Sequence, residues 1–550
     1  MLHILTGRAG SGKTTQVLRR MREAGERRPQ LLLVPEQASF ETERRFCREN
    51  GNQAGRYGEV LSFTRLENRV LSLGGGAAEP VLDAGGRLLV LYAALRSVQA
   101  NLTVYAMPSQ KPAFLTSLLT TLDELKSYCI TGEQLTQVGE ETEGLDGEKL
   151  RDLGLIFGAY EAMTARGALD PRDRLTRLAE ALTREDWAAG KDFYLDAFAD
   201  FTPQERAVLS TLLGKANSVT VALTCDKLEE DEGGAGIFSP ARRTARQLLR
   251  LAQERGVSRE IEVRSGGAGP KTAALAHLEG QLFAPRPDPW AGEAEELTML
   301  KANSPYSEVE WTAAEILRLV REEGYRFRDI AVCARSLEGC GSLVETIFAR
   351  YGVPVFLSRM SDILQKPILA LITSALEAAS GGYRYDDVFR YLKTGLTGLS
   401  AEDVDLLENY VLKWSLEGSA WTGARDWANH PRGYGLPFSE GDRALLARLN
   451  TLRRQVAQTL EGLRKNPDKT GRGQAAALYA FLEAAGVPER LAQRTEELNR
   501  RGQAALAEED AQLWEILCGG LEQCAQILGD APMELDEFSK LFALVLSQYD

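Results

Sequence analysis

The sequence predicts an α/β protein in which parallel-sheet cores are interrupted by large all-helical insertions. Two patterns support this fold class. Short apolar runs alternate with amphipathic stretches in two parts of the chain, which is typical of strand–helix–strand units with parallel strands. Between and after these parts, apolar residues recur at helical spacing only. The 550 residues are enough for three or four domains, each with its own core.

The first predicted core comprises residues 1–80 and 190–285. One helix is expected to end near Met21 and a second to begin near Gln37. Each of these helices lies between two predicted strands. The predicted strands are LHILT, LLLVP, VLSF, DFYLDAF and SVTVALTCD. This order is the rhythm of a parallel sheet with helical crossovers.

The stretch between the two halves of this core, residues 81–189, is predicted to be a helical insertion. Asp83 and Thr131 are predicted N-caps, because their short polar side chains precede amphipathic runs. Thr131 has Gln134 three residues later, the spacing of a capping box. A second capping box, TPQE from Thr202, is predicted to open the helix after DFYLDAF.

The second half of the chain repeats this organisation. Residues 286–296 are predicted to be a linker, since the surrounding FAPRPDPWAGEAEE holds three prolines. A second α/β core is predicted over 297–370, with strands LTMLKAN, DIAVCARS and VPVFLS and helices through Trp311 and from Gly341. Residues 371–550 are predicted to be a second helical insertion. The final ELDEFSKLFALVLSQYD ends without a completed unit, so we expect the chain to be the front portion of a longer protein.

Composition narrows the function. The formal net charge of -13 argues against non-specific nucleic-acid binding by the chain as a whole. Residues 1–70, however, hold 13 Lys and Arg against 8 Asp and Glu, so an anionic ligand is expected near the N-terminus. Seven cysteines without C-x-x-C spacing and three histidines argue against a zinc ribbon or a disulfide scaffold. The absence of a signal peptide or a long apolar stretch predicts a cytoplasmic protein without a membrane partner.

The motif with the clearest chemistry is G-x-x-x-x-G-K-[ST], a P-loop, between the first predicted strand and helix. In such a loop, backbone N–H groups and the helix N-terminus surround phosphates, the lysine reaches the β and γ oxygens, and the hydroxyl binds Mg²⁺. The alternative is a glycine-rich turn with a solvated lysine. The predicted nucleotide-binding residues are Gly7, Arg8, Ala9, Gly10, Ser11, Gly12, Lys13 and Thr14.

A carboxylate at the end of a neighbouring strand should complete the metal site, and FYLDAFAD supplies Asp196. We predict Thr14 and Asp196 as the metal ligands; the alternative for Asp196 is a helix-capping or turn role. Asp200 is positioned either to cap the following helix or to join the metal shell. The residue after Asp196 is Ala197, which cannot activate water for hydrolysis.

Four segments together resemble AddB, the B subunit of bacterial AddAB helicase-nucleases: ILTGRAGSGKT, LLLVPEQASFETE, FYLDAFADFTPQE and DIAVCARSLEGCGSLVETIFARYGVPVFLS. The resemblance covers essentially the whole chain. It implies P-loop NTPase cores of the UvrD-like superfamily 1 helicase type. The two predicted cores then correspond to domains 1A and 2A and the two insertions to 1B and 2B. The chain is expected to end before the rest of 2A and before a nuclease domain.

The resemblance also implies ligands and partners. These are ATP, Mg²⁺, an AddA-type helicase/nuclease subunit, and double- and single-stranded DNA. A [4Fe-4S] cluster is implied for the full-length family member but not for this portion. Pro35 to Phe40 fall where such proteins follow single-stranded DNA, although a plain strand-to-helix turn fits equally. Arg335 matches a helicase arginine near the γ-phosphate, with an ordinary surface arginine as the alternative.

The chain departs from active motors of this type at one segment. They carry D-E-x-Q-D where this chain has DAFAD, from Asp196 to Asp200, so the catalytic Glu and the Gln are both missing. We therefore predict an ATP-binding, DNA-guiding scaffold without nuclease, in a hydrolase complex that resects double-strand breaks and recognises Chi for homologous recombination. An autonomous ATP-driven DNA translocase is the alternative. A small-molecule kinase would explain the P-loop but not the size.

Overall fold

The computed structural model describes residues 1–73, 80–108, 111–229, 236–264, 272–284, 286–337, 339–357 and 363–549. The chain divides into a large unit, residues 1–266 with 363–549, and a small unit, residues 267–362. The predicted assignment of segments to helicase domains stays a prediction.

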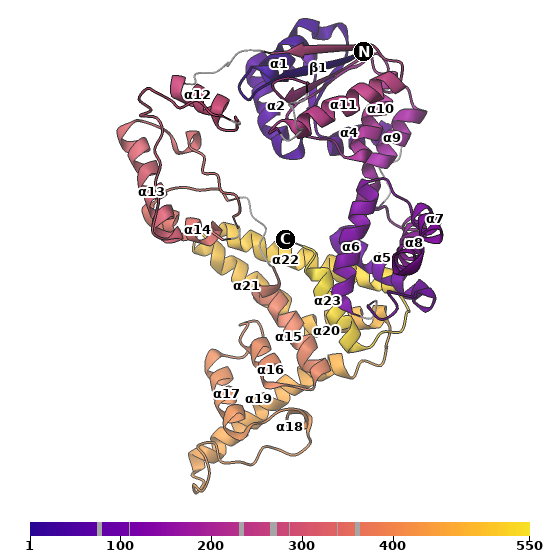
Figure 1. Cartoon of the computed structure of the whole chain (residues 1–550). Coiled ribbons are helices and arrows are strands. Elements are labelled where there is room, and N and C mark those ends of the chain that lie inside the picture. Colours follow the sequence, from indigo (N-terminus) through magenta and orange to yellow (C-terminus); the bar gives the residue numbers. More distant parts are fainter. Residues whose placement is uncertain are drawn as a thin grey trace. The chain divides into compact units, whose positions relative to one another are not determined.

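The described part of the large unit contains a six-stranded parallel sheet of order β3-β2-β4-β5-β1-β6 (Figure 1). All five predicted strands are present, and β6 was not predicted. Because every pairing is parallel, the carboxyl ends of the strands lie at one edge of the sheet. The strands are β1 (Leu2–Gly7), β2 (Gln30–Leu33), β3 (Glu59–Leu61), β4 (Asp192–Leu195), β5 (Ser218–Thr224) and β6 (Arg259–Val263).

Helices cover both faces of this sheet (Figure 1). Alternate residues of each strand point to opposite faces, so Ile4 packs in one core cluster and Leu5 in the other. One face is covered by α4 (Phe63–Leu73), α9 (Arg174–Arg184), α10 (Pro203–Lys215) and α11 (Ser239–Glu254). The other is covered by α1 (Lys13–Ala24), α2 (Glu36–Asn50) and α3 (Ala54–Tyr57).

The three helix starts predicted from capping residues are confirmed. The Asp83 side chain accepts a hydrogen bond from the backbone N–H of Gly86 at 2.7 Å. Thr131 and Thr202 each form a complete capping box with the residue three positions later. These bonds satisfy N–H groups that the first turn of a helix leaves without partners, so each cap fixes where its helix begins.

Helices from two distant stretches of the large unit form one apolar cluster, here called the helical core. Asp83 shows how the stretches join, because its carboxylate also accepts hydrogen bonds from Gln523 Nε2 and the Tyr549 hydroxyl, both at 2.7 Å. The first stretch contributes α5 (Ala84–Val98), α6 (Pro112–Ser127), α7 (Gly132–Glu141) and α8 (Gly144–Thr164). The second contributes α15 (Pro367–Gly381), α16 (Tyr385–Leu392), α17 (Ala401–Trp414), α18 (Ser419–Thr422), α19 (Glu440–Arg464), α20 (Gly471–Ala484), α21 (Val487–Arg500), α22 (Ala504–Gln523), a π-helical turn (Cys524–Leu528) and α23 (Leu535–Leu546).

A buried ion network ties together the first helices of this core. Asp170 is fully buried and accepts hydrogen bonds from Arg87 Nε at 2.9 Å and the Tyr160 hydroxyl at 2.8 Å, with Lys126 Nζ at 3.2 Å. Burial alone would raise the pKa of Asp170, but Lys126 and Arg87 outweigh it and hold the pKa below its ordinary value. Lys126 also binds Asp173. The carboxylate is therefore ionised at neutral pH and compensated on several sides.

The small unit contains α12 (Ala273–Gln281), α13 (Pro305–Glu322) and α14 (Gly341–Tyr351). The helices predicted through Trp311 and from Gly341 are confirmed. The three strands predicted here are wrong: residues 297–303, 330–336 and 353–357 are irregular, Asp329 ends a 3-10 turn (Phe327–Asp329), and Ser358 lies outside the described residues.

The apolar patterns that predicted these strands serve side-chain packing instead. Ile330 and Leu357 pack against the cluster formed by α13 and α14, and Val353 lies within it. Val332 is 53% exposed and Phe356 is 91% exposed. A strand needs a partner to pair its backbone groups, and none of these segments pairs with another in the described residues.

Of the helices in the described residues, none combines the length and the apolar character that crossing a membrane requires.

Candidate nucleotide-binding site

The turn between β1 and α1 forms a tight loop with specific demands for glycine. Gly10 and Gly12 have φ angles of 75° and 80°, in the left-handed region that side chains disfavour. At Gly7 a Cβ atom would lie 2.3 Å from Ser11 Oγ and 3.1 Å from the Arg264 carbonyl oxygen, so a side chain there would force Ser11 to move. The loop thus brings its backbone close around the N-terminus of α1, where N–H groups and the helix dipole favour an anion.

Lys13 points back into this loop and is largely buried. Its Nζ donates hydrogen bonds to the carbonyl oxygens of Gly7 at 2.7 Å and Arg8 at 2.9 Å. Burial lowers the pKa of Lys13, and the charge of Asp196 partly opposes this shift. Phosphate oxygens are stronger acceptors than neutral carbonyls, so the ammonium is placed to exchange these partners for phosphate.

Thr14 and Asp196 meet although 182 residues separate them. Thr14 Oγ1 donates to Asp196 Oδ2 at 2.5 Å, and the other carboxylate oxygen accepts the N–H of Ala197 at 2.9 Å. Sheet order explains the meeting: β1 and β4 flank β5, and the carboxyl ends of all three lie at the same edge. A hydroxyl and a carboxylate side by side are oxygen ligands of the kind that Mg²⁺ takes beside phosphate and water.

The residue after Asp196 has an unusual backbone. Ala197 has a φ angle of 66°, in the left-handed region where a side chain costs about 1 to 2 kcal/mol. Its methyl group offers no proton acceptor. Asp200 is engaged elsewhere, because its carboxylate accepts from Thr244 Oγ1 of α11 at 2.9 Å, and the cap of the next helix is Thr202.

Two charged residues at this edge were missed by sequence reasoning. Arg264, directly after β6, donates from Nε to the Ser11 carbonyl at 3.2 Å and from Nη1 to Gln16 Oε1 at 3.1 Å. Asp226, two residues after β5, lies 2.9 Å from Arg242 and 3.9 Å from Arg8. The available signal was position: a charged side chain just after a strand that borders β1 lies beside the loop.

Arg335, the predicted γ-phosphate contact, is exposed and belongs to the small unit. Its predicted role therefore stays a prediction.

Chemically, the site can hold an anion and a divalent cation. Ser11 Oγ is buried in the loop without a hydrogen-bond partner, so a donor or acceptor from a ligand would satisfy it. Lys13 and Arg264 supply positive charge, and Thr14 with Asp196 supplies oxygen ligands. Ala197 has no side-chain group that could act as a general base, and the two Asp196 oxygens accept hydrogen bonds from Thr14 Oγ1 and the Ala197 N–H.

The fold and the site define the class: a parallel α/β protein with a glycine-rich strand–loop–helix unit, a carboxylate on a neighbouring strand and extensive helical regions. Within this class the chain belongs to the family described as "ADDB, N-terminal", whose model matches residues 4–279. The resemblance to AddB predicted from the sequence is confirmed.

Curated relatives extend the match to the whole chain. A protein of Thermoanaerobacter sp. (strain X514) is 33% identical over 559 residues, which cover 100% of this chain and 49% of the relative. A protein of Desulforudis audaxviator (strain MP104C) is 36% identical over 565 residues, covering 98% of this chain and 48% of the relative. Both are named as the B subunit of an ATP-dependent helicase/deoxyribonuclease. The chain spans about half the length of these relatives.

Proposed function

We propose that this chain is the ATP-binding, helicase-like portion of the B subunit of a helicase/deoxyribonuclease. One observation carries the proposal: Lys13 is folded into the glycine-rich loop while Thr14 Oγ1 bonds Asp196 at 2.5 Å. The loop, the ammonium and the hydroxyl–carboxylate pair are the parts that a nucleoside triphosphate with Mg²⁺ requires. The loop, Lys13 and Thr14 are continuous in sequence, and the fold brings Asp196 to them from 182 residues away.

The residues would share the ligand in a definite way. Backbone N–H groups of Gly7–Thr14 and the Lys13 ammonium would hold the phosphates, and Thr14 and Asp196 would hold Mg²⁺. Bound Mg²⁺ would supply charge neutralisation of the phosphate oxygens. Arg264 fixes the loop through the Ser11 carbonyl, and so acts as a positioning residue for Ser11 and the start of α1.

The partners follow from the relatives' name. We propose that the chain assembles with an AddA-type motor subunit and contacts double- and single-stranded DNA, guiding it during resection of double-strand breaks and Chi recognition. Phe40 supports a DNA path along Pro35 to Phe40, because its ring is 76% exposed at the start of α2. We propose a cytoplasmic location and assign neither nuclease activity nor an iron–sulfur cluster to this portion.

The proposal predicts that ATP binding is separable from turnover. We expect negligible DNA-stimulated ATP hydrolysis by this chain alone, since a missing general base costs about 10² to 10⁴ in rate. The measurement is steady-state phosphate release with and without single-stranded DNA. Robust, DNA-stimulated release that disappears in Lys13→Ala would instead identify an autonomous translocase.

Ala197→Glu provides a sharper version of this assay. A glutamate supplies the carboxylate that Ala197 lacks. The backbone at 197 nevertheless remains in the left-handed region, where any side chain is strained. We expect no more than a few-fold increase in turnover. A rise of about 100-fold or more, the range of a positioned base, would show that Ala197 alone separates this chain from an active motor.

A further inference from the structure

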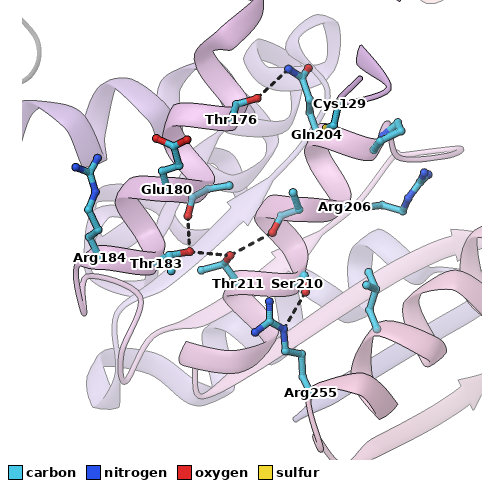
Figure 2. A pocket seen from close by; sticks show the side chains of 14 residues that line it. Cys129, Thr176, Glu180, Thr183, Arg184, Gln204, Arg206, Ser210, Thr211 and Arg255 are labelled. Atoms are coloured by element: carbon cyan, nitrogen blue, oxygen red, sulfur yellow. Dashed lines mark hydrogen bonds between the residues drawn. The ribbon is translucent and has the colours of Figure 1, made fainter. Parts of the chain in front are cut away.

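A groove on the large unit, separate from the glycine-rich loop, is lined by a second set of arginine and hydroxyl side chains (Figure 2). Its volume is about 780 Å³. It lies along α9 and α10, with contributions from the end of α11 and from Cys129. Its lining comes from helices that cover one face of the sheet. Lys13 and Thr14, in contrast, open α1 after the loop that follows β1, and Asp196 directly follows β4. The groove is thus built by different elements from the nucleotide site.

Three arginines around this groove have no carboxylate within ion-pair distance among the described residues, although Arg206 interacts electrostatically with the neighbouring Glu205. Arg184, Arg206 and Arg255 form no ion pair with any described residue. Arg255 Nε donates to Ser210 Oγ at 2.9 Å, and Arg206 Nη1 donates to the Phe201 carbonyl at 2.5 Å. Arginines nearby behave differently: Arg250 on α11 pairs with Glu254 at 2.9 Å. Glu180 is the one carboxylate among the described lining residues, so the groove is locally positive in a chain of net charge -13.

Hydroxyl groups lie between the arginines, and those of Thr183 and Thr211 donate to the Ala179 and Ala207 carbonyls of their own helices. Figure 2 shows Thr183, Thr211 and Ser210 in a row, with the three arginines at separate points around it. The Thr183 and Thr211 hydroxyl oxygens lie 3.4 Å apart. Guanidinium groups contact nucleic-acid phosphates, and the Ser210 hydroxyl, which accepts from Arg255 Nε, keeps its own proton for such a contact. No aromatic residue lines the described groove, so stacking on bases is not available to it.

We propose that this groove binds the DNA backbone through phosphates, without reading sequence. A protein partner is less well served, because such interfaces centre on buried aromatic or large apolar anchors, and the lining holds no aromatic residue and one large apolar one, Leu251. The choice of DNA as the source of phosphate rests on the proposed function. This groove would be a second DNA contact besides the one proposed along Pro35 to Phe40. Removing its charge should leave nucleotide binding unchanged.

The test measures DNA affinity against salt for the wild-type chain and for a variant with Arg184→Gln, Arg206→Gln and Arg255→Gln. The probes are fluorescein-labelled single strands and duplexes of mixed sequence, followed by fluorescence anisotropy. Each lost phosphate contact reduces the salt slope by about 0.7 to 0.9. We therefore expect the triple variant to lose about 2 to 3 from the slope and to bind on the order of 10²-fold more weakly at 0.1 M salt.

Arg184→Gln alone guards against a folding artefact, since the Arg184 side chain makes no hydrogen bond to the part of the chain that the structure describes; a slope lower by about 0.7 to 0.9 is expected. Arg250→Gln, at an exposed and paired position, should leave the slope unchanged. Equal slopes in wild type, Arg184→Gln and the triple variant would overturn the proposal that this groove binds DNA, and would leave the proposed function standing.

Other outcomes identify a different ligand. If the wild-type chain binds no DNA, both this site and the DNA contact of the proposed function fail, while ATP calorimetry still tests the nucleotide site. If tripolyphosphate displaces DNA as well as unlabelled DNA does at equal phosphate concentration, the groove is a site for small phosphates rather than for a strand. If oligoglutamate does so at equal charge, it is a site for an acidic peptide. Either displacement result overturns the assignment to DNA.

Discussion

Replacing Asp170 with alanine is expected to destabilise the helical core by about 3 to 5 kcal/mol. The carboxylate is fully buried between Arg87, Lys126 and the Tyr160 hydroxyl. Its removal leaves two buried cations with less compensation, and the loss of one partner of a buried ion pair costs more than the pair contributes. Urea denaturation followed by circular dichroism measures the effect as a lower midpoint.

Asp186→Ala is the matched control. This aspartate also contacts a lysine, Lys215 at 3.2 Å, but its side chain is 88% exposed. A solvated pair of this kind contributes at most about 1 kcal/mol. If Asp170→Ala shifts the midpoint no further than Asp186→Ala, the buried ion network does not hold the first helices of the core together.

Replacing Lys13 with alanine is expected to weaken ATP binding by roughly 10- to 150-fold, because a charge-assisted hydrogen bond is worth about 1.5 to 3 kcal/mol. Calorimetric titration with ATP in the presence of Mg²⁺ measures the change. The Lys13 side chain bonds only the carbonyls of its own loop, so the fold should survive.

Lys149→Ala controls for the loss of a positive charge elsewhere. Lys149 lies on α8 and pairs with Asp146 at 3.3 Å, outside the sheet core. Its replacement should leave the ATP affinity unchanged. An ATP affinity of Lys13→Ala equal to that of Lys149→Ala would remove Lys13 from the site.

Local signals in the sequence predicted much of the fold. Asp83, Thr131 and Thr202 were recognised because a cap is a short-range interaction, complete within three or four residues. The five predicted strands of the sheet were recognised because burial on both faces makes each run apolar. The glycine-rich loop was recognised both from its short-range motif and from the apolar strand that precedes it.

Signals that depend on distant partners were lost or misread. The strand β6 alternates charged and apolar residues at the sheet edge and has no apolar run, so both it and Arg264 were missed. In the small unit the apolar runs around Ile330 and Val353 were taken for strands, although strand formation depends on a pairing partner. Asp170 and Arg87 are 83 residues apart, and neither residue alone indicates a buried pair.

For the candidate site, the sequence predicted which residues would meet but not how. Thr14 and Asp196 were paired through their places after strands of a parallel sheet, and the structure brings them to 2.5 Å. The left-handed backbone of Ala197 and the bond from Asp200 to Thr244 had no sequence signal, because both depend on the packing of α11 and on the turn after β4. Those details underlie the proposal that ATP binding is separable from hydrolysis.

The most direct test of the central claim is a calorimetric titration of the wild-type chain with ATP and, separately, with adenosine, both with Mg²⁺. If the glycine-rich loop, Lys13 and the Thr14–Asp196 pair hold phosphates and metal, ATP will bind saturably at one site per chain and adenosine will show no comparable binding. The absence of saturable binding up to millimolar ATP, or binding of adenosine as tight as that of ATP, would contradict the claim.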